Sequence, residues 1–379
     1  MNNLEPYLPY MLQLLKLLVE TESPSNDKSA VDRVGKLFED ELRSIGAEVQ
    51  IIQNQTAGNH LIAKFQVNSQ EAIKGKENGF LLLCHMDTVY PIGTIKSMPF
   101  QEKDGRLMGP GVADMKSGGV ISLAAIKYLI DNDLFTSLPV SILFTSDEEI
   151  GSGTSKKLIE ELALKSSIVL VMEPGMPDGS IKIWRKGVGG FHIEIGGKAA
   201  HAGGDHANGR NAIEELAYQV IRIQKLTDYS LGTTLNVGVA EGGTVSNVVP
   251  DHAWMDVDLR VKVPEEADRI VNEINQLTPV LDGTTMRITG GMNRPPMPYD
   301  DMMENTFSKA VDIANSIGIQ LKGMGTGGAS DGNFVAPLGI PLLDGLGAIG
   351  GNYHSQDEYI LKDSLVSRAE LLVALLQNW

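Results

Sequence analysis

The sequence of 379 residues holds a single cysteine, Cys84, so one chain cannot form an internal disulfide, and nothing points to an oxidising compartment. Basic residues are in deficit, since 32 Lys and Arg stand against 48 Asp and Glu, and the resulting net charge of −16 argues against nucleic-acid binding. No apolar run approaches the roughly 20 residues of a membrane-spanning helix. The N-terminus also lacks the basic start and small-residue cleavage site of a signal peptide. We therefore expect a soluble, cytoplasmic protein that binds neither nucleic acid nor membrane.

Short apolar runs and helical segments alternate along much of the chain. Residues 79–85, 138–145 and 167–172 are apolar runs typical of strands buried on both faces. Segments with helical spacing lie between them at 118–130 and 155–164. This alternation predicts an α/β fold with a mostly parallel sheet covered by helices. The chain is 42% hydrophobic, which excludes disorder as its main state, and it is long enough for about two domains.

The pattern changes between residues 189 and 291, where strands alternate apolar and polar residues and two amphipathic helices separate them. The order βαββαβ predicts a ferredoxin-like α+β domain with one exposed sheet face. We expect this domain, 189–291, to be inserted into the α/β domain formed by 1–188 and 292–379. The polar segment 64–77 is predicted to be a mobile loop.

Candidate metal ligands follow the ends of the three buried strands. They are His85 and Asp87 after the first strand, Asp147, Glu148 and Glu149 after the second, and Glu173 after the third. Asp114 lies in a glycine-rich turn before a helix. In open α/β sheets ligands collect at the carboxyl ends of the strands, and carboxylates gathered there repel one another unless a cation lies among them. Histidine together with carboxylate suits zinc, with cobalt or manganese as substitutes.

Each of these residues alone has a simpler explanation. A histidine at a strand end is commonly structural, and an acidic run after a strand commonly begins a helix, where the helix dipole favours negative charge. The combination of all four strand-end and turn positions favours a metal site.

Seven motifs together resemble one family. They are HMDTVYP, GPGVADMKSGG, TSDEEIGS, MEP, KAAHAGG, VSNVVP and YHS. The chain resembles, over essentially its whole length, the M20 family of zinc metallopeptidases, which includes aminoacylases and acetylornithine deacetylase. Its pattern is most similar to that of the glutamate carboxypeptidases in this family.

The resemblance implies a catalytic zinc-exopeptidase domain, an inserted lid and dimerisation domain, and two divalent ions, Zn²⁺ with Co²⁺ or Mn²⁺ as substitutes. Asp114 would bridge the ions. His85 and Glu173 would complete one site, and Glu149 and His354 the other.

The family pattern also implies roles beside the metals. Glu148 would be the general base that takes a proton from a metal-bridging water and then protonates the leaving amine. Asp87 would accept the second ring N–H of His85, and a cis peptide would follow Asp114. His201 would reach across a homodimer to stabilise the oxyanion.

Three residues match substrate-binding positions of the family: Asn247, Arg260 and Arg294. A guanidinium can bind a carboxylate through two parallel hydrogen bonds. The expected reaction is release of a C-terminal amino acid, glutamate, from an N-acyl or peptidyl substrate. The alternatives are an N-acyl-amino-acid deacetylase, of the acetylornithine deacetylase or succinyl-diaminopimelate desuccinylase type, and a dipeptidase.

Two further alternatives lie outside this class. A nucleotide-binding protein is disfavoured because neither G-x-G-x-x-G after a strand nor G-x-x-x-x-G-K-[ST] occurs. An inactive, binding-only relative is disfavoured because all five expected ligands and Glu148 are present.

Overall fold

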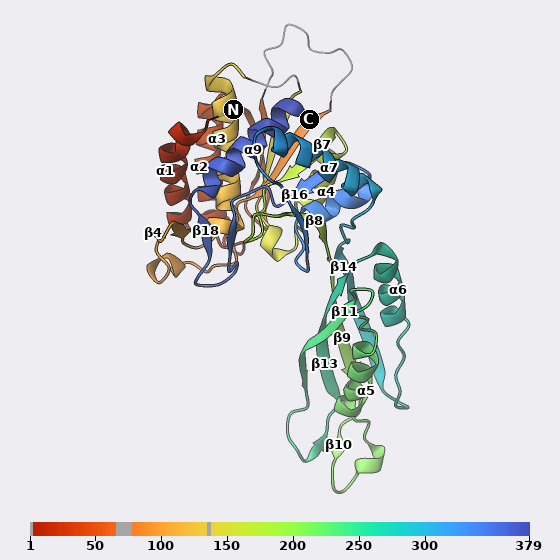
Figure 1. Ribbon diagram of the computed structural model, residues 1–379. Helices are drawn as coiled ribbons and strands as arrows, with labels where there is room; N and C mark the ends of the chain where they lie inside the picture. Colours follow the sequence, from red (N-terminus) through yellow and green to blue (C-terminus); the bar gives the residue numbers. More distant parts are fainter. Residues whose placement is uncertain (1–2, 66–77, 135–137) are drawn as a thin grey trace. The chain divides into compact units, whose positions relative to one another are not determined.

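The computed structural model describes residues 3–65, 78–134 and 138–379 (Figure 1). It divides into two compact units: unit 1 is Met1–Trp184, Tyr299–Gly325 and Ser330–Trp379, and unit 2 is Arg185–Pro298 and Thr326–Ala329. The predicted insertion, 189–291, falls within unit 2. Most of the predicted loop 64–77 lies outside the described residues.

A central sheet forms the middle of unit 1, with strand order β1-β2-β6-β3-β7-β16-β8-β15 among the described residues. The strands are β1 (Glu48–Ile52), β2 (His60–Phe65), β3 (Gly79–His85), β6 (Val140–Thr145), β7 (Ser166–Val171), β8 (Ile181–Arg185), β15 (Gly323–Thr326) and β16 (Leu342–Asp344). The neighbours β6, β3, β7 and β16 pair in parallel. Strands β1, β2 and β8 pair antiparallel with their neighbours. The predicted α/β class is confirmed, and the sheet is mixed, with its parallel part in the centre.

Helices of unit 1 cover this sheet. They are α1 (Leu8–Glu20), α2 (Lys28–Ser44), α3 (Ser117–Asp131), α4 (Lys156–Ala163), α7 (Asp301–Ser316), α8 (Gly332–Val335) and α9 (Ser364–Asn378). Figure 1 shows α1, α2, α3 and α9 as one group beside the sheet, and their apolar faces join the sheet in one core. The start of α2 follows from its sequence, because the Asp27 side chain accepts the Ala30 N–H as an N-cap. No helix among the described residues is long and apolar enough to cross a membrane.

A small second sheet in unit 1 has the order β17-β18-β5-β4. Its strands are β4 (Gln101–Lys103), β5 (Arg106–Met108), β17 (Gly350–Gly351) and β18 (Tyr359–Leu361). This sheet brings a late part of the chain beside the region that precedes α3. The segment with the predicted ligand His354 joins β17 to β18, so this pairing places that histidine near the central sheet.

Unit 2 is a four-stranded antiparallel sheet of order β11-β13-β9-β14 with two helices on one face (Figure 1). Along the chain the elements are β9 (Gly187–Gly196), α5 (Ala212–Gln224), β11 (Thr234–Gly242), β13 (His252–Val261), α6 (Pro264–Asn275) and β14 (Thr285–Arg294). A pair of two-residue strands, β10 (Ala200–His201) and β12 (Val248–Val249), lies beside them. This order is the predicted ferredoxin-like βαββαβ unit with its own core.

Candidate metal centre

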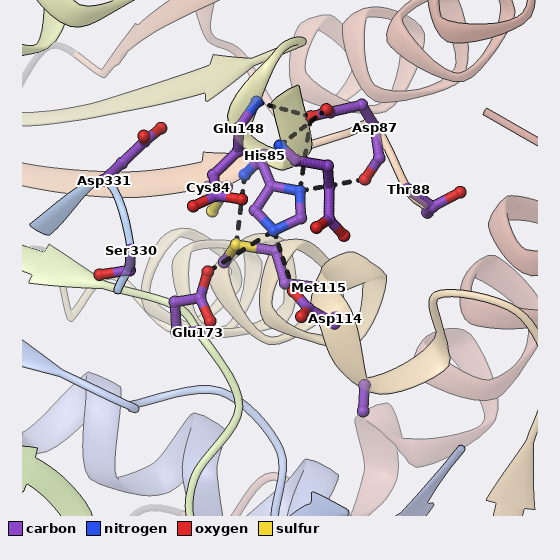
Figure 2. Close-up of polar contacts among 12 residues, drawn as sticks. Cys84, His85, Asp87, Thr88, Asp114, Met115, Glu148, Glu173, Ser330 and Asp331 are labelled. Atoms are coloured by element: carbon purple, nitrogen blue, oxygen red, sulfur yellow. Dashed lines mark hydrogen bonds and ion pairs between the residues drawn. The ribbon is translucent and has the colours of Figure 1, made fainter. Parts of the chain in front are cut away.

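The carboxyl ends of three neighbouring strands carry the predicted ligands of unit 1. Strand β3 ends on His85, and it lies between β6 and β7 in the sheet. Glu149 follows β6 in a short 3-10 helix, Glu148–Ile150, and Glu173 lies two residues after β7. Because parallel strands end at one edge of a sheet, residues far apart in sequence lie close together there. Figure 2 shows His85 with Asp87 on one side and Asp114 and Glu173 on the other.

Asp114 lies between the two histidines of the predicted site. Its Oδ1 is 2.9 Å from Nε2 of His85, and its Oδ2 is 3.2 Å from Nε2 of His354. His85 Nε2 is also 3.5 Å from a carboxylate oxygen of Glu173, and His354 Nε2 is 3.3 Å from Glu149. The structure therefore brings all five predicted ligands together, with one Asp114 oxygen toward each half of the set.

The side chains of this cluster fit a divalent cation. Ligand atoms of His85, Asp114 and Glu149 all lie within 4.8 Å of one another. The Oε1 atom of Glu149 is buried without a hydrogen-bond partner, which costs free energy unless a cation or a proton satisfies it. Burial and the nearby Asp114 charge raise the pKa of the Glu149 carboxyl to about 7. Carboxylate oxygens together with imidazole nitrogens are the donor set that zinc and related ions prefer.

The carboxyl groups of Asp114 and Glu149 favour the charged form of the His354 imidazole. Hydrogen bonds to Asp114 and Glu149 raise the pKa of His354 to about 11. In Asp114, burial acts to raise the carboxyl pKa, but the hydrogen bonds from His354 and His85 outweigh it and the pKa falls well below its ordinary value. The carboxylates around His354 therefore stabilise a positive charge, and a bound metal cation would supply such a charge.

Asp87 connects the segments that carry the ligands. It is fully buried, and its carboxylate accepts the Ser25 hydroxyl at 2.7 Å and the backbone N–H groups of Glu148 and Glu149 at 3.2 Å each. His85 Nδ1 lies 3.0 Å from the backbone carbonyl oxygen of Asp87 and 3.5 Å from its carboxylate. Asp87 was expected to accept that ring N–H. Its backbone oxygen is nearer to the ring than its carboxylate, which faces the turn of Glu148 and Glu149.

The turn before α3 holds Asp114, and the peptide bond to Met115 is cis, as the resemblance implied. Glu358, which the sequence did not single out, is fully buried beneath this turn. Its carboxylate accepts the N–H groups of Ala113 at 2.8 Å and Asp114 at 3.1 Å, and the Tyr90 hydroxyl at 2.5 Å. Glu358 is therefore a positioning residue for Asp114.

Two further contacts lie close to the predicted ligands, one at Glu173 and one at the start of α3. Lys182, also missed from the sequence, has its Nζ 3.8 Å from a carboxylate oxygen of Glu173 and is buried. Gly118, the second residue of α3, lies so close to the end of β7 that a Cβ there would lie 2.0 Å from the backbone oxygen of Met172. The glycine of the motif thus permits the close approach of helix and strand on which the position of Asp114 depends.

His201 is the last residue of β10 and Asn247 directly precedes β12, and both lie in unit 2. The Nδ1 atom of His201 accepts the backbone N–H groups of Gly203 at 3.1 Å and Gly204 at 3.0 Å. A neutral ring held in this way carries its proton on Nε2 and can donate it in a hydrogen bond. The backbone oxygen of Asn247 accepts the N–H of Ala202 at 2.9 Å, so the two predicted residues belong to one local structure.

The two predicted substrate arginines also lie in unit 2. Arg260, on β13, pairs with Asp258 of the same sheet face, Nε to Oδ1 at 2.9 Å and Nη2 to Oδ2 at 3.0 Å. Arg294 ends β14, is largely buried, and donates from Nη1 to Asn293 at 3.1 Å. The roles of these two arginines, of His201 and of Asn247 toward a substrate stay predictions.

An α/β sheet with a candidate cation site at its strand ends fits the class of metal-dependent hydrolases. Within that class, the chain belongs to the peptidase family M20/M25/M40, whose sequence profile matches residues 81–378. The predicted family is thereby confirmed.

Individual relatives agree with this assignment. Carboxypeptidase G2 of Pseudomonas sp. is 28% identical over 375 residues, which cover 97% of this chain and 88% of that protein. Among solved structures, aminopeptidase PepT from Bacillus cereus has a TM-score of 0.77 at 22% identity, covering 97% of this chain and 98% of its own. The YXEP protein of Bacillus subtilis, described as a dinuclear metal-binding peptidase, has a TM-score of 0.72 at 16% identity, covering 98% of each chain.

Proposed function

We propose that this protein is a metallocarboxypeptidase that releases a C-terminal amino acid, glutamate, from N-acyl or peptidyl substrates. The observation that carries the proposal is the Asp114 carboxylate, whose two oxygens face two separate His–carboxylate pairs. The similarity to carboxypeptidase G2 over 97% of the chain supports the direction of cleavage.

Two divalent ions would be held by five residues. His85 and Glu173 would bind one ion, Glu149 and His354 the other, and Asp114 both. When bound, the ions supply Lewis-acid chemistry, polarising a substrate carbonyl and lowering the pKa of water from 15.7 to about 7. Zn²⁺ suits this donor set, and Co²⁺ or Mn²⁺ are substitutes.

Glu148 is the residue that moves the proton in this proposal. Its neighbour Glu149 takes part in the candidate cluster, and Asp87 accepts the backbone N–H groups of both residues, which supports a place for Glu148 beside the site. The carboxylate takes a proton from the attacking water and delivers it to the nitrogen of the departing amino acid. His201 donates its Nε2–H to the oxygen that becomes negative during the attack. Arg260 and Arg294 bind the substrate carboxylate, with Asn247 as a further polar contact.

A homodimer formed through unit 2 belongs to this proposal. Helix α5 exposes Ile213, Tyr218 and Ile221, and each of them is more than 40% accessible. Strand β11 is an edge of its sheet and exposes Val239. An exposed edge strand beside a row of apolar side chains is the kind of surface that pairs with a second copy.

The proposal is tested with a panel of substrates and protein of known metal content. N-acyl glutamates and peptides with C-terminal glutamate are compared with N-acetylornithine, N-succinyl-diaminopimelate and dipeptides. We expect the highest kcat/KM for C-terminal glutamate. Efficient hydrolysis of N-acetylornithine with none of the glutamate substrates would overturn the proposal in favour of a deacetylase.

A further inference from the structure

His60 is a buried histidine to which the mechanism proposed above gives no role. It is the first residue of β2, and 2% of it is exposed. Because β2 pairs antiparallel with β6, the start of β2 lies beside the end of β6. Segment 146–155, the base turn, leads from β6 to α4 and contains Glu148 and Glu149. The histidine therefore lies where it can act on the turn that carries the proposed base.

The His60 ring contacts both ends of the base turn. Its Nδ1 atom lies 3.0 Å from Oγ of Ser146, and its Nε2 atom lies 3.1 Å from Oγ1 of Thr154. These two hydroxyl groups stand on either side of the acidic residues in the sequence. Since the ring belongs to β2 and both partners belong to one turn, the imidazole connects that turn to a strand of the central sheet.

The hydrogen atoms in these contacts can be assigned from their partners. The Ser146 hydroxyl donates to the backbone oxygen of Gly58 at 2.5 Å, so the ring is the donor at Nδ1. Burial lowers the pKa of His60, although nearby carboxylates act to raise it, and in the neutral ring Nε2 is then an acceptor. The Thr154 hydroxyl lies within reach of both this nitrogen and the Asp147 carboxylate, the latter at 2.7 Å. One neutral imidazole thus directs both of its nitrogens at the base turn.

Other bonds give the base turn its shape. The Asp147 carboxylate accepts the Thr154 N–H at 2.7 Å and the Ser155 hydroxyl at 2.6 Å, and both of these bonds lie within the turn. Asp87 attaches the middle of the turn, as described above, and His60 attaches its two ends to β2. Attachment at both places matters because a displacement of about 1 Å in a catalytic group can cost about 10²-fold in rate.

We propose that His60 is a positioning residue for the base turn, whose two ends it joins to β2. This inference rests on the proposed function for the roles of Glu148 and Glu149. Loss of the hydrogen bonds of His60 should loosen the turn, weaken the ion that Glu149 binds and slow the proton transfer by Glu148.

Two variants separate hydrogen bonding from packing. His60→Phe keeps a ring in the core but makes neither bond, whereas the amide of His60→Gln can both donate and accept. Hydrogen exchange of amides 148–152 in metal-free protein should be about tenfold faster in His60→Phe than in wild type, as expected for the net loss of one or two hydrogen bonds. The control Thr306→Val removes a buried hydroxyl that donates to Met302 in α7, and it should leave these amides unchanged.

Metal binding and turnover supply the second set of measurements. Competition with a chromogenic chelator should show about 10–100-fold weaker binding of one of the two ions in His60→Phe, and kcat should fall by a similar factor. The KM should stay close to that of wild type, because the variant leaves the proposed substrate-binding residues in place. His60→Gln should restore most of each loss, and Thr306→Val should show none.

Wild-type exchange in His60→Phe, or losses of equal size in His60→Gln, would overturn the proposal. Faster exchange with unchanged metal affinity and kcat would also overturn it. If His60→Phe does not fold, Ser146→Ala and Thr154→Val remove the two hydroxyl partners one at a time, and unchanged exchange in both would contradict the role of His60. Absence of hydrolysis or of metal binding would instead contradict the proposed function, because exchange in metal-free protein measures the turn without either.

Discussion

The two units use their sheets in different ways. In unit 1 every residue of β3 is buried, so side chains that perform chemistry are found where the strand ends, at His85. In unit 2 burial alternates along β13, and polar residues such as Asp258 and Arg260 occupy the exposed face. A sheet covered on both faces can offer a site only at its edge, whereas a half-covered sheet offers its open face. The candidate metal site of the first unit and the predicted substrate-binding residue Arg260 of the second are consistent with this difference.

Replacing the proposed general base should give the largest effect. Glu148→Gln in unit 1 keeps size and hydrogen bonding but cannot accept the proton, and we expect kcat to fall by about 10²–10⁴-fold. Bound metal and thermal stability should stay unchanged. The control Glu161→Gln, on the exposed face of α4, should be fully active. Unchanged hydrolysis by Glu148→Gln would remove this residue from the mechanism.

The second-largest effect is expected from His201→Ala, which tests whether unit 2 contributes to the reaction. His201→Ala removes the Nε2–H donor that Gly203 and Gly204 orient, and we expect kcat to fall by about 10²–10³-fold, as for other oxyanion donors. His206→Ala, in the same exposed loop, is the control. A loss of similar size in both variants, or in neither, would remove His201 from the mechanism.

A smaller effect is expected from the residue that orders the metal centre without belonging to the ligand set. Asp87→Asn weakens the acceptor for the N–H groups of Glu148 and Glu149. Losses of this kind are typically 10–100-fold in metal affinity or activity. Competition with a chromogenic chelator measures the affinity, and Asp40→Asn, an exposed carboxylate on α2, serves as control. Equal metal affinity of Asp87→Asn and wild type would contradict the role of Asp87.

The smallest effect concerns the stability of unit 2. Glu215 is buried, and its carboxylate accepts the N–H groups of Val280 and Leu281 and a hydrogen bond from Gln219. Burial acts to raise its pKa, but these hydrogen bonds prevail and the pKa is lowered. A lowered native pKa stabilises the fold above the unfolded value of about 4.3, and this stabilisation is lost as pH falls through the native value.

Glu215→Gln should therefore lower the free energy of unfolding of unit 2 by about 1.5–3 kcal/mol at neutral pH. The difference from wild type should shrink as pH falls below about 4. Hydrogen exchange of α5 and β13 amides measures it, with α3 of unit 1 as the internal reference. A difference that is the same at pH 3 and pH 7, or one that spreads equally to α3, would contradict this account.

Much of the fold follows from pattern, and the exceptions have physical reasons. Apolar runs predicted β3, β6 and β7, and alternation predicted β9 and β13. The antiparallel flank was missed, since β1 and β2 mix polar with apolar residues and lack the continuous apolar runs of β3, β6 and β7. The strands of the small sheet are two or three residues long, which is too short for any periodicity to be detected.

The sequence predicted those site residues that lie at or just after the carboxyl ends of the buried strands. His85, Glu149 and Glu173 could be assigned in this way, but His354 follows a two-residue strand and only the family resemblance indicated it. Glu358 and Lys182 act through tertiary contacts with Asp114 and Glu173 that no local pattern encodes.

Metal stoichiometry tests the central claim most directly. Protein stripped with a chelator and titrated with Zn²⁺, Co²⁺ or Mn²⁺ should bind about two ions per chain, as expected for a two-metal hydrolase, and regain activity as the sites fill. Asp114→Asn should reduce binding at both sites, because one carboxylate faces both halves of the cluster. Full hydrolysis by the stripped protein, or unaltered binding of both ions by Asp114→Asn, would contradict the account.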